Sequence, residues 1–300
     1  MSTQQFGPFT EADEALRTQL LASEFSSDLL DAEFQKYSNA TLLGGPKILT
    51  ASDRILDVAR RAGGNVVIGG QAAAIMHGTR WYEHDFVIEV FRHRTGCNKP
   101  TPDTRVHRTK LKDSDIMMID DVCVTTPIRT AFDIGRIAPP WRGLGNMDAL
   151  QRATGFDIDE LARFVAGKAR QRGIRQVRVL IPLIDGGAES HPESWLRLLI
   201  IVNGLPIPET QIEVFNEYGQ LVARLDMGYR DLRIGIEYDG EAYHSSPEQL
   251  ASDQERDAEL KRLDWHIIRV RNTPLRTEPW MICTEVRQAI IERGGYIEAP

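Results

Sequence analysis

The chain has 300 residues, of which 42% are hydrophobic and 26% charged. This balance supports buried cores and excludes global disorder, and the length suits two domains of ordinary size. No apolar run approaches the roughly 20 residues that cross a bilayer, and the N-terminal segment lacks the basic start and apolar stretch of a signal peptide. The sequence therefore predicts a cytoplasmic protein without a membrane partner.

The net charge is −7, but the charges are unevenly distributed. The stretch 161–180 contains six bases and no acid, and residues 92–112 form a second basic stretch. A solvated helix face explains such a run as well as a phosphate-binding strip does. If the strip binds nucleic acid, its contacts to the phosphates are Lys168, Arg170, Arg172, Arg175 and Arg178.

The three cysteines, Cys97, Cys123 and Cys283, are widely spaced and odd in number. They match neither a zinc-binding pattern nor a disulfide framework. We therefore expect reduced thiols.

In the first half, helical spacing of apolar residues predicts helices over 10–35 and 51–62. A short strand, a glycine turn and a small-residue helix follow in "GGNVVIGGQAAAIMHG", and residues 85–124 suggest three or four short strands. "TPIRTAFDIGRI" predicts a helix with Thr126 as its cap and Pro127 at its first position. "APPWRGLGN" breaks the pattern and is a candidate domain boundary, and two helices are expected over 147–174.

The second half predicts a helix from about Pro192 to Val202, then three strands over "TQIEVFN", "LVARLDM" and "LRIGIEYDG". A long polar helix, a strand at "WHIIRVR" and a closing helix near 278–293 complete the order αβββαβα. This order indicates a mixed sheet flanked by helices.

Three acids lie where strands usually carry apolar residues: Asp226, Glu237 and Asp239. Residues two apart in a strand face the same side, so Glu237 and Asp239 share a face. A turn centred on Asp231 and Leu232 would place Asp226 opposite Glu237, whereas another turn centre would shift the pairing. Converging carboxylates repel one another unless a cation such as Mg²⁺ lies between them. The alternative is an acidic strand edge that prevents aggregation.

The residues around these acids, "SHPESWLRLLIIVNGLPIPETQIEV", "LVARLDMGYRDLRIGIEYDGEAYH" and "SDQERDAELKRLDWHIIRV", resemble a family of largely actinobacterial proteins. Their C-terminal domain is similar to the very-short-patch-repair endonucleases of the PD-(D/E)XK superfamily. The resemblance covers roughly residues 186–295 and implies phosphodiester hydrolysis with Mg²⁺ or Mn²⁺ as cofactor. It further implies that Glu193, Asp226 and Glu237 hold the metal.

Asp239 stands where the superfamily usually has lysine. Either catalysis is lost, or a cation elsewhere takes over the role of this lysine. By position, the candidates are His244, Arg256 and Arg269. The catalytic set expected from the resemblance is therefore Asp226, Glu237, Asp239 and His244. Arg256 is expected to contact nucleic acid, although it could equally pair with an acid on its own helix.

The first half carries the motifs "VVIGGQAAAIMHGT" and "VCVTTPIRTAFDIGR", the second with Thr126, Arg129 and Thr130. These motifs resemble the AbiEi antitoxin-like proteins, in which a winged-helix segment precedes an α/β domain. Together the resemblances imply an α+β fold in four segments. These are a helical, degenerate winged-helix-like segment (1–50), an AbiEi-like α/β domain (51–140), a basic helical linker (141–185) and a restriction-endonuclease-like domain (186–300).

A third pattern overlaps the first half. Gly69 and Gly70 precede Glu83 and Asp85 with a spacing similar to that of nucleotidyltransferases, whose third acid would be Asp115, Asp120 or Asp121. The leading hypothesis remains a metal-dependent endonuclease that acts on DNA. The main alternative is a non-catalytic DNA-binding regulator or antitoxin with a toxin partner.

Overall fold

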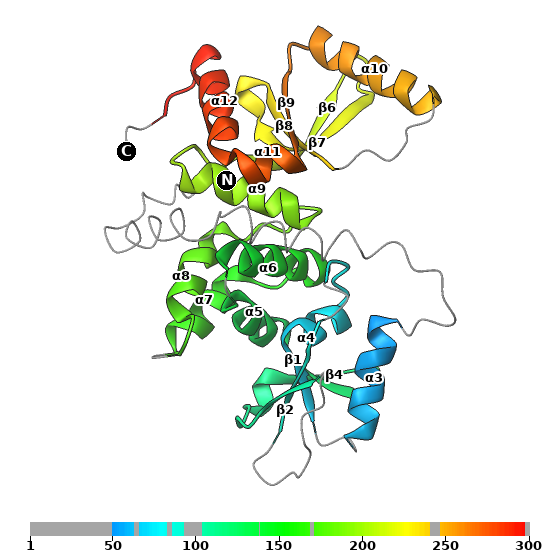
Figure 1. The fold of residues 1–300 in the computed structure, drawn as a ribbon, viewed down its shortest axis with the longest axis vertical. Helices are drawn as coiled ribbons and strands as arrows, with labels where there is room; N and C mark the ends of the chain where they lie inside the picture. The colour runs from blue at the N-terminus through cyan, green and yellow to red at the C-terminus, as the bar shows by residue number, and fades with distance from the viewer. Residues whose placement is uncertain are drawn as a thin grey trace. The chain divides into compact units, whose positions relative to one another are not determined.

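The structure is a computed structural model that describes residues 50–62, 66–82, 86–92, 104–137, 139–168, 171–240 and 247–297. The chain divides into two compact units, with the boundary between Gly186 and Gly187 (Figure 1). Unit 1 contains the described residues up to Gly186, and unit 2 contains those from Gly187 onward. The helix expected over 10–35 lies outside the described residues.

Unit 1 begins with a mixed sheet whose strands are in the order β3-β2-β1-β5-β4. Strand β1 is antiparallel to β2 and parallel to β5. The elements in chain order are α3 (Ala51–Arg61), β1 (Val67–Gly69), α4 (Gly70–Met76), β2 (Ile88–Phe91), β3 (Thr104–His107), β4 (Ile116–Ile119) and β5 (Val122–Thr125), with the short helix η2 (Asp113–Asp115) before β4. The strand, glycine turn and helix expected after residue 62 are confirmed in β1 and α4.

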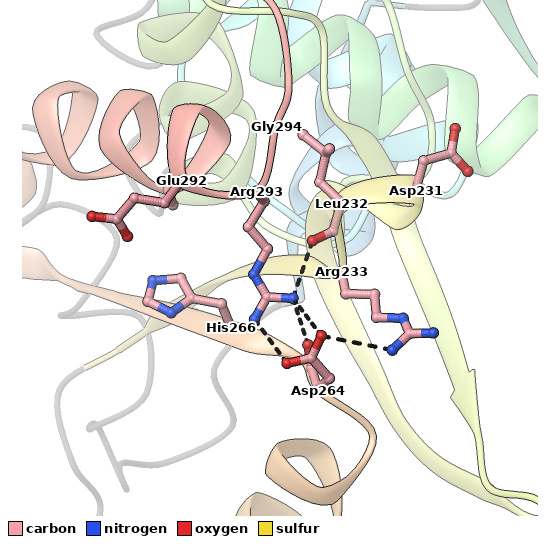
Figure 2. Close-up of a pocket in the computed structure, with 9 residues that line it drawn as sticks. Asp231, Leu232, Arg233, Asp264, His266, Glu292, Arg293 and Gly294 are labelled. Carbon is pink, nitrogen blue, oxygen red and sulfur yellow. Dashed lines mark hydrogen bonds and ion pairs between the residues drawn. The ribbon is translucent and has the colours of Figure 1, made fainter.

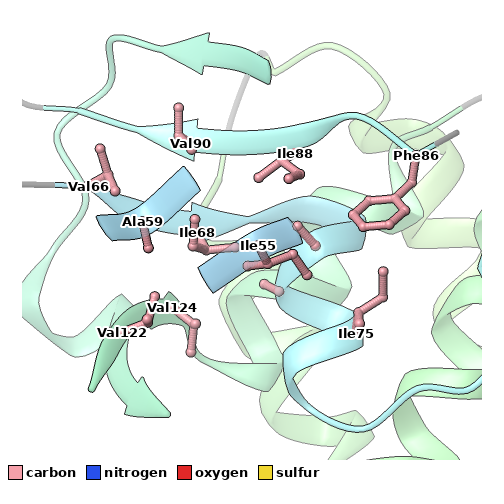
Figure 3. Packing of buried hydrophobic residues seen from close by; sticks show 12 residues of the cluster. Ile55, Ala59, Val66, Ile68, Ile75, Phe86, Ile88, Val90, Val122 and Val124 are labelled. Carbon is pink, nitrogen blue, oxygen red and sulfur yellow. The ribbon is translucent and has the colours of Figure 1, made fainter. Parts of the chain in front are cut away.

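Helix α3 covers this sheet because its apolar residues recur every fourth position. Ile55 and Ala59 are buried beside Ile68 and Val124 of the central strands (Figure 3). The helix begins at a capping box: the Thr50 side chain accepts the Asp53 N–H, and the Asp53 carboxylate accepts the Thr50 N–H. The cap and the apolar face together explain why the helix starts where it does.

Four helices complete unit 1: α5 (Pro127–Gly135), α6 (Pro140–Thr154), α7 (Ile158–Ala166) and α8 (Ile174–Leu180), with η3 (Ile181–Leu183). The predicted start of α5 is confirmed, since the Thr126 side chain accepts the Arg129 N–H and Pro127 occupies the first turn. The two helices expected over 147–174 correspond to α6 and α7. Gly155 is the C-cap of α6, and Asp157 is the N-cap of α7.

The domain boundary expected at "APPWRGLGN" is wrong, because this segment is the first part of α6. Proline is tolerated in a first helical turn, whose N–H groups have no partner within the helix. Trp141 and Leu144 of the segment are buried. Residues 141–185 are likewise a part of the compact unit 1 rather than a linker.

Unit 2 contains a four-stranded sheet in the order β6-β7-β8-β9. Strands β6, β7 and β8 are antiparallel neighbours, whereas β8 and β9 are parallel. The elements are α9 (His191–Val202), β6 (Glu209–Phe215), β7 (Leu221–Tyr229), η4 (Arg230–Leu232), β8 (Ile234–Asp239), α10 (Pro247–Arg262), β9 (His266–Arg271), α11 (Asn272–Thr277) and α12 (Pro279–Glu292). The expected order is confirmed, with α11 as an additional short helix, and so is the α+β class.

Helix α10 is the connection that parallel β8 and β9 require, and it packs against β7 (Figure 1). Its Leu260 is buried against Ile212, Val214 and Leu225 of the sheet. Helix α9 is buried along its whole length, with Trp195 1% exposed. In the part of the chain that the structure describes, no helix has the length and apolar character needed to cross a membrane.

Strands β7 and β8 approach closely at a pair of glycines. Gly228 is paired with Gly235, and a Cβ at Gly228 would lie 2.1 Å from the Ile234 carbonyl oxygen. Because this oxygen belongs to the backbone, it cannot move without opening the β7–β8 pairing.

We therefore expect Gly228→Ala to destabilise the protein by about 1 to 3 kcal/mol, the range for overpacking. Urea unfolding measures the change. Gly240→Ala is the matched control, since a Cβ there would meet only a Tyr238 ring carbon at 3.9 Å. Equal stability of the two variants would contradict the close approach of the strands.

Candidate active site

The register between β7 and β8 is the one that brings two of the acids together. The paired residues are Met227 with Ile236, Gly228 with Gly235, and Tyr229 with Ile234. The same offset sets Asp226 opposite Glu237. The turn between the strands lies at η4, so the predicted turn centre and pairing are confirmed.

Asp226 lies where the two strands separate. The regular pairing ends at Met227 and Ile236, and beyond it the Tyr238 N–H donates to the Asp226 carboxylate at 2.8 Å. The side chain thereby substitutes for a backbone acceptor. This hydrogen bond fixes the carboxylate at the edge of the β7–β8 pairing.

Gln211 on β6 is a residue near this point that the sequence did not single out. It adopts a left-handed φ of 52° between Thr210 and Ile212, which are paired with Met227 and Leu225 of β7. Such backbone is costly for a residue other than glycine and is concentrated at functional sites. Its buried Nε2 has no hydrogen-bond partner among the described residues. In the sequence, the one signal that could have identified Gln211 is its position opposite Asp226, and this position is known only once the β6–β7 register is known.

Burial raises the pKa of Asp226 to about 6, and the Tyr238 N–H opposes this rise. The negative charges of Glu237 and Glu189 raise the pKa of Asp226 further, whereas Arg224 lowers it. Burial and negative charge therefore outweigh the one arginine in their effect on the pKa of this carboxylate, and a bound cation would stabilise its ionised form.

Glu193 lies in the first turn of α9. Its Oε2 accepts the Glu189 N–H at 2.7 Å, and its Oε1 accepts the Ser190 hydroxyl at 2.8 Å. Burial raises its pKa to about 7, and the charge of Asp226 adds to the effect. Glu193 therefore supports the Ser190 cap of its own helix, and its carboxylate lies close enough to Asp226 for the two charges to interact.

Glu237 is neutralised by arginines. Arg256 of α10 donates to both of its carboxylate oxygens, at 3.2 and 3.3 Å, and Arg269 Nε lies 3.5 Å from Oε2. Arg269 also pairs with Asp257. Arg256 was expected to contact nucleic acid or to pair on its own helix, yet its bidentate partner is an acid of the candidate site.

Asp239 is exposed at the end of β8 and lies 3.6 Å from Arg271 Nε. The parallel register sets it beside Arg271 and sets Glu237 beside Arg269. The two acids and the two arginines therefore lie at the carboxyl ends of neighbouring parallel strands, where α/β sheets place ligand sites.

The expectation that Glu193, Asp226 and Glu237 share one cation is contradicted. Within the described ranges, no three Asp, Glu, His or Cys side chains are grouped so that they could hold a metal ion. Glu193 is held by the start of its helix, and Glu237 is held by arginines. The donors still fit a hard cation bound by Asp226 and one further carboxylate, since Mg²⁺ takes one or two carboxylates with water and substrate phosphate.

Two expected residues, His244 and Arg170, lie outside the described residues. The rest of the basic strip belongs to unit 1, where Arg172, Arg175 and Arg178 are exposed. Lys168 lies over the Phe164 ring, and its carbonyl accepts a hydrogen bond from Arg178.

The motif residues of unit 1 are used in its core. Arg129 pairs with Asp133 at 2.7 Å and with Asp115 at 3.5 Å, and Thr130 bonds to Thr125. For the nucleotidyltransferase pattern, Glu83 and Asp85 lie outside the described residues. Of its possible third acids, Asp115 is paired with arginine, and Asp120 and Asp121 form the β4–β5 turn with positive φ.

A polar hollow of about 800 Å³ lies at the other end of β8, near the start of the strand (Figure 2). Arg293 of α12 crosses it and donates to the Asp264 carboxylate and to the carbonyls of Leu232 and Asp264. Arg233 also pairs with Asp264. These bonds attach the last helix to the sheet, and none of the candidate acids lines the hollow.

The raised pKa values predict how stability depends on pH in chelator-treated protein. The folded state keeps the Asp226 proton up to a pKa of about 6 instead of 3.8, so stability falls as pH rises through this interval. Asp226→Asn removes the ionisation and keeps an acceptor for Tyr238. We expect this variant to be about 1 to 3 kcal/mol more stable than the native chain at pH 8, and by much less at pH 4.

Urea unfolding at the two pH values measures the difference. Asp253→Asn, on an exposed position of α10, is the control and should match the native chain at both. An Asp226→Asn protein that is less stable than the native chain at pH 8 would mean that the ionised carboxylate is a net stabiliser of the sheet.

Comparison with known proteins agrees with the architecture of unit 2. Residues 206–290, from β6 into α12, match the family model described as REase_MTES_1575. Two relatives from Mycobacterium tuberculosis, "Uncharacterized protein MT2308" (strain CDC 1551 / Oshkosh) and "Uncharacterized protein Rv2248" (strain ATCC 25618 / H37Rv), are each 29% identical over 234 residues. Each alignment covers 76% of this chain and 84% of the relative. No solved structure matches the chain. Unit 2 is thus a restriction-endonuclease-like mixed sheet flanked by helices.

Proposed function

We propose that unit 2 is a metal-dependent endonuclease that hydrolyses phosphodiester bonds, with DNA as its substrate. The observation that carries the proposal is Asp226, held by the Tyr238 N–H at the point where two strands separate and set opposite Glu237. A restriction-endonuclease-like sheet with acids at this position supports action on nucleic acid.

Asp226 and Glu237 would hold Mg²⁺ or Mn²⁺, together with water and a phosphate oxygen of the substrate. Burial and the charge of Asp226 raise the pKa of Glu193 to about 7, and a cation at this place would lower it again. A bound divalent ion would supply Lewis-acid polarisation of the phosphate and a more acidic water.

Other side chains of the site would orient the substrate. Arg269 and Arg271 stand next to the acids at the end of β9, where guanidinium groups can contact a phosphate in two places. Asp239 lacks the positive charge of the usual lysine, but the Arg271 Nε lies 3.6 Å from its carboxylate. Arg271 is therefore the positive charge of the site that lies nearest to this position.

The exposed arginines of α8 in unit 1 would bind the DNA backbone independently of sequence. Arg175 and Arg178 are one turn apart on the helix, and Arg172 precedes it. Phosphate contacts from such side chains supply most of the affinity of non-specific DNA binding.

The alternative function is a non-catalytic DNA-binding regulator, such as an antitoxin with a toxin partner, whose nuclease site has decayed. Two observations favour it: both oxygens of Glu237 accept hydrogen bonds from Arg256, and Asp239 replaces the usual lysine. The AbiEi-like motifs of the first half would fit this function. Cleavage assays separate the two functions.

If the site is a nuclease, Asp226→Asn should reduce plasmid nicking in Mn²⁺ by at least about 100-fold, because the negative charge that binds the metal is lost and one carboxylate oxygen becomes an NH₂ group. DNA binding should be unchanged or stronger, since one negative charge is removed. Asp253→Asn is the control, and gel shifts in the absence of metal measure binding. Cleavage by Asp226→Asn at the native rate, or no cleavage of DNA or RNA by the native chain, would contradict the nuclease.

The basic strip has a separate test. Arg172→Ala together with Arg175→Ala should weaken binding to all duplex sequences and reduce the slope of log K against log salt by up to about 1.8, roughly 0.9 for each phosphate contact. The matched control replaces Arg60 and Arg61, two exposed arginines of α3, by alanine. Equal slopes for the two double variants would indicate that the strip is only a solvated helix face.

A further inference from the structure

The carboxylate of Glu237 has cationic partners on both of its oxygens. Its side chain is 12% exposed, and Arg256 approaches it with both terminal nitrogens. Arg269 adds a second guanidinium at 3.5 Å. Asp226, which lies opposite Glu237, has no comparable cationic partner among the described residues. Arg224 lowers the pKa of Asp226, but its effect is smaller than that of either Glu237 or Glu189, which raise it. Positive charge is therefore concentrated on one member of the acid pair.

Arg256 belongs to a helix that is weakly anchored near this residue. Over residues 251–262 of α10, Leu260 is the one buried side chain, and the residues before Arg256 are exposed. The paired groups of Arg256 are Glu237 and, at 3.8 Å, Asp257. The bidentate contact to Glu237 and the ion pair of the neighbouring Asp257 with Arg269 are thus the described interactions that hold this turn of α10 against the strand ends.

The guanidinium of Arg256 is not fully satisfied in this position. Its buried Nε has no hydrogen-bond partner in the described parts of the chain. A buried donor without a partner costs free energy, and this cost opposes the gain from the bidentate contact. The side chain is 32% exposed, so it has a route to solvent, where the Nε can bond to water.

The Arg256 guanidinium and a divalent cation compete for the Glu237 carboxylate. Arg256 takes one lone-pair direction on each oxygen, and its positive charge repels an ion bound to either of them. Asp226 alone would give the ion a single protein ligand. Binding by Asp226 and Glu237 together is therefore opposed while Arg256 stays in place.

We infer that Arg256 is a built-in counter-ion of the site, which neutralises the Glu237 carboxylate in the metal-free protein and competes with a divalent cation for it. This inference rests on the proposed function only in assuming that the ion binds at Asp226 and Glu237. Through Arg256, helix α10 would then oppose metal binding at the Glu237 carboxylate.

The test is Mn²⁺ binding by the full chain without DNA, followed at pH 8 by electron paramagnetic resonance of free Mn²⁺. We expect Arg256→Gln to bind Mn²⁺ roughly tenfold more tightly than the native chain, since the competing charge is gone. Adding Glu237→Gln to this variant should abolish the gain. Arg262→Gln is the matched control, because Arg262 lies on the same helix and pairs with Glu259 and Glu217 instead.

Circular dichroism shows whether Arg256→Gln folds. If it does not, the Mn²⁺ affinity of Arg256→Lys tests the inference instead. A lysine keeps the charge but cannot occupy both oxygens, so the gain in affinity should be smaller than tenfold and still measurable. Unchanged or weaker Mn²⁺ affinity in a folded Arg256 variant would overturn the inference, and so would a gain that survives Glu237→Gln. Tighter Mn²⁺ binding without cleavage of DNA or RNA by any variant would leave the counter-ion standing and remove the nuclease.

Discussion

The hydrogen bond from the Tyr238 N–H to the Asp226 carboxylate is the interaction on which the candidate site depends. It lies where β7 and β8 cease to pair, so a side chain rather than a carbonyl completes the edge of the sheet. Because an acceptor is needed there in any case, the sheet can keep a partly buried acid whose pKa is raised to about 6. The same hydrogen bond holds Asp226 opposite Glu237, and the β6–β7 register sets Gln211, with its left-handed backbone, across from Asp226 on the other side.

The acids of the candidate site in unit 2 differ in how much positive charge lies beside them. Glu193 and Asp226 lie together with raised pKa values, whereas Glu237 is held by two arginines. A fold selected for stability alone would distribute its counter-ions more evenly, because like charges in a partly buried place are unfavourable. As a result, a cation would be favourable beside Asp226, whereas the neighbouring Glu237 carboxylate already has two arginine partners.

Unit 1 depends on a different principle, since its prominent motif residues are used for packing. Arg129 is buried between Asp133 and Asp115 and lies over the Phe91 ring at 5.2 Å, so its charge is neutralised inside the unit. The exposed arginines around α8, in contrast, are available on the surface, as are other exposed bases of the unit such as Arg60 and Arg61. Any contact of unit 1 with a polyanion would therefore use exposed bases and not the buried arginine.

The sequence by itself determined most helices and strands of both units, though not α8 and α11, because apolar periodicity and capping residues such as Thr126 are local signals. It offered a turn centred on Asp231 and Leu232 as one possibility, and the structure decided that this centre, which sets Asp226 opposite Glu237, is the one used. Local signals misjudged 138–146, because a proline pair reads as a break even where it opens a helix. Only the tertiary structure decided which charges meet. Arg256 and Glu237 are 19 positions apart in the sequence and meet only when α10 folds against the sheet. The partner of Arg256 could therefore not be predicted from neighbouring residues.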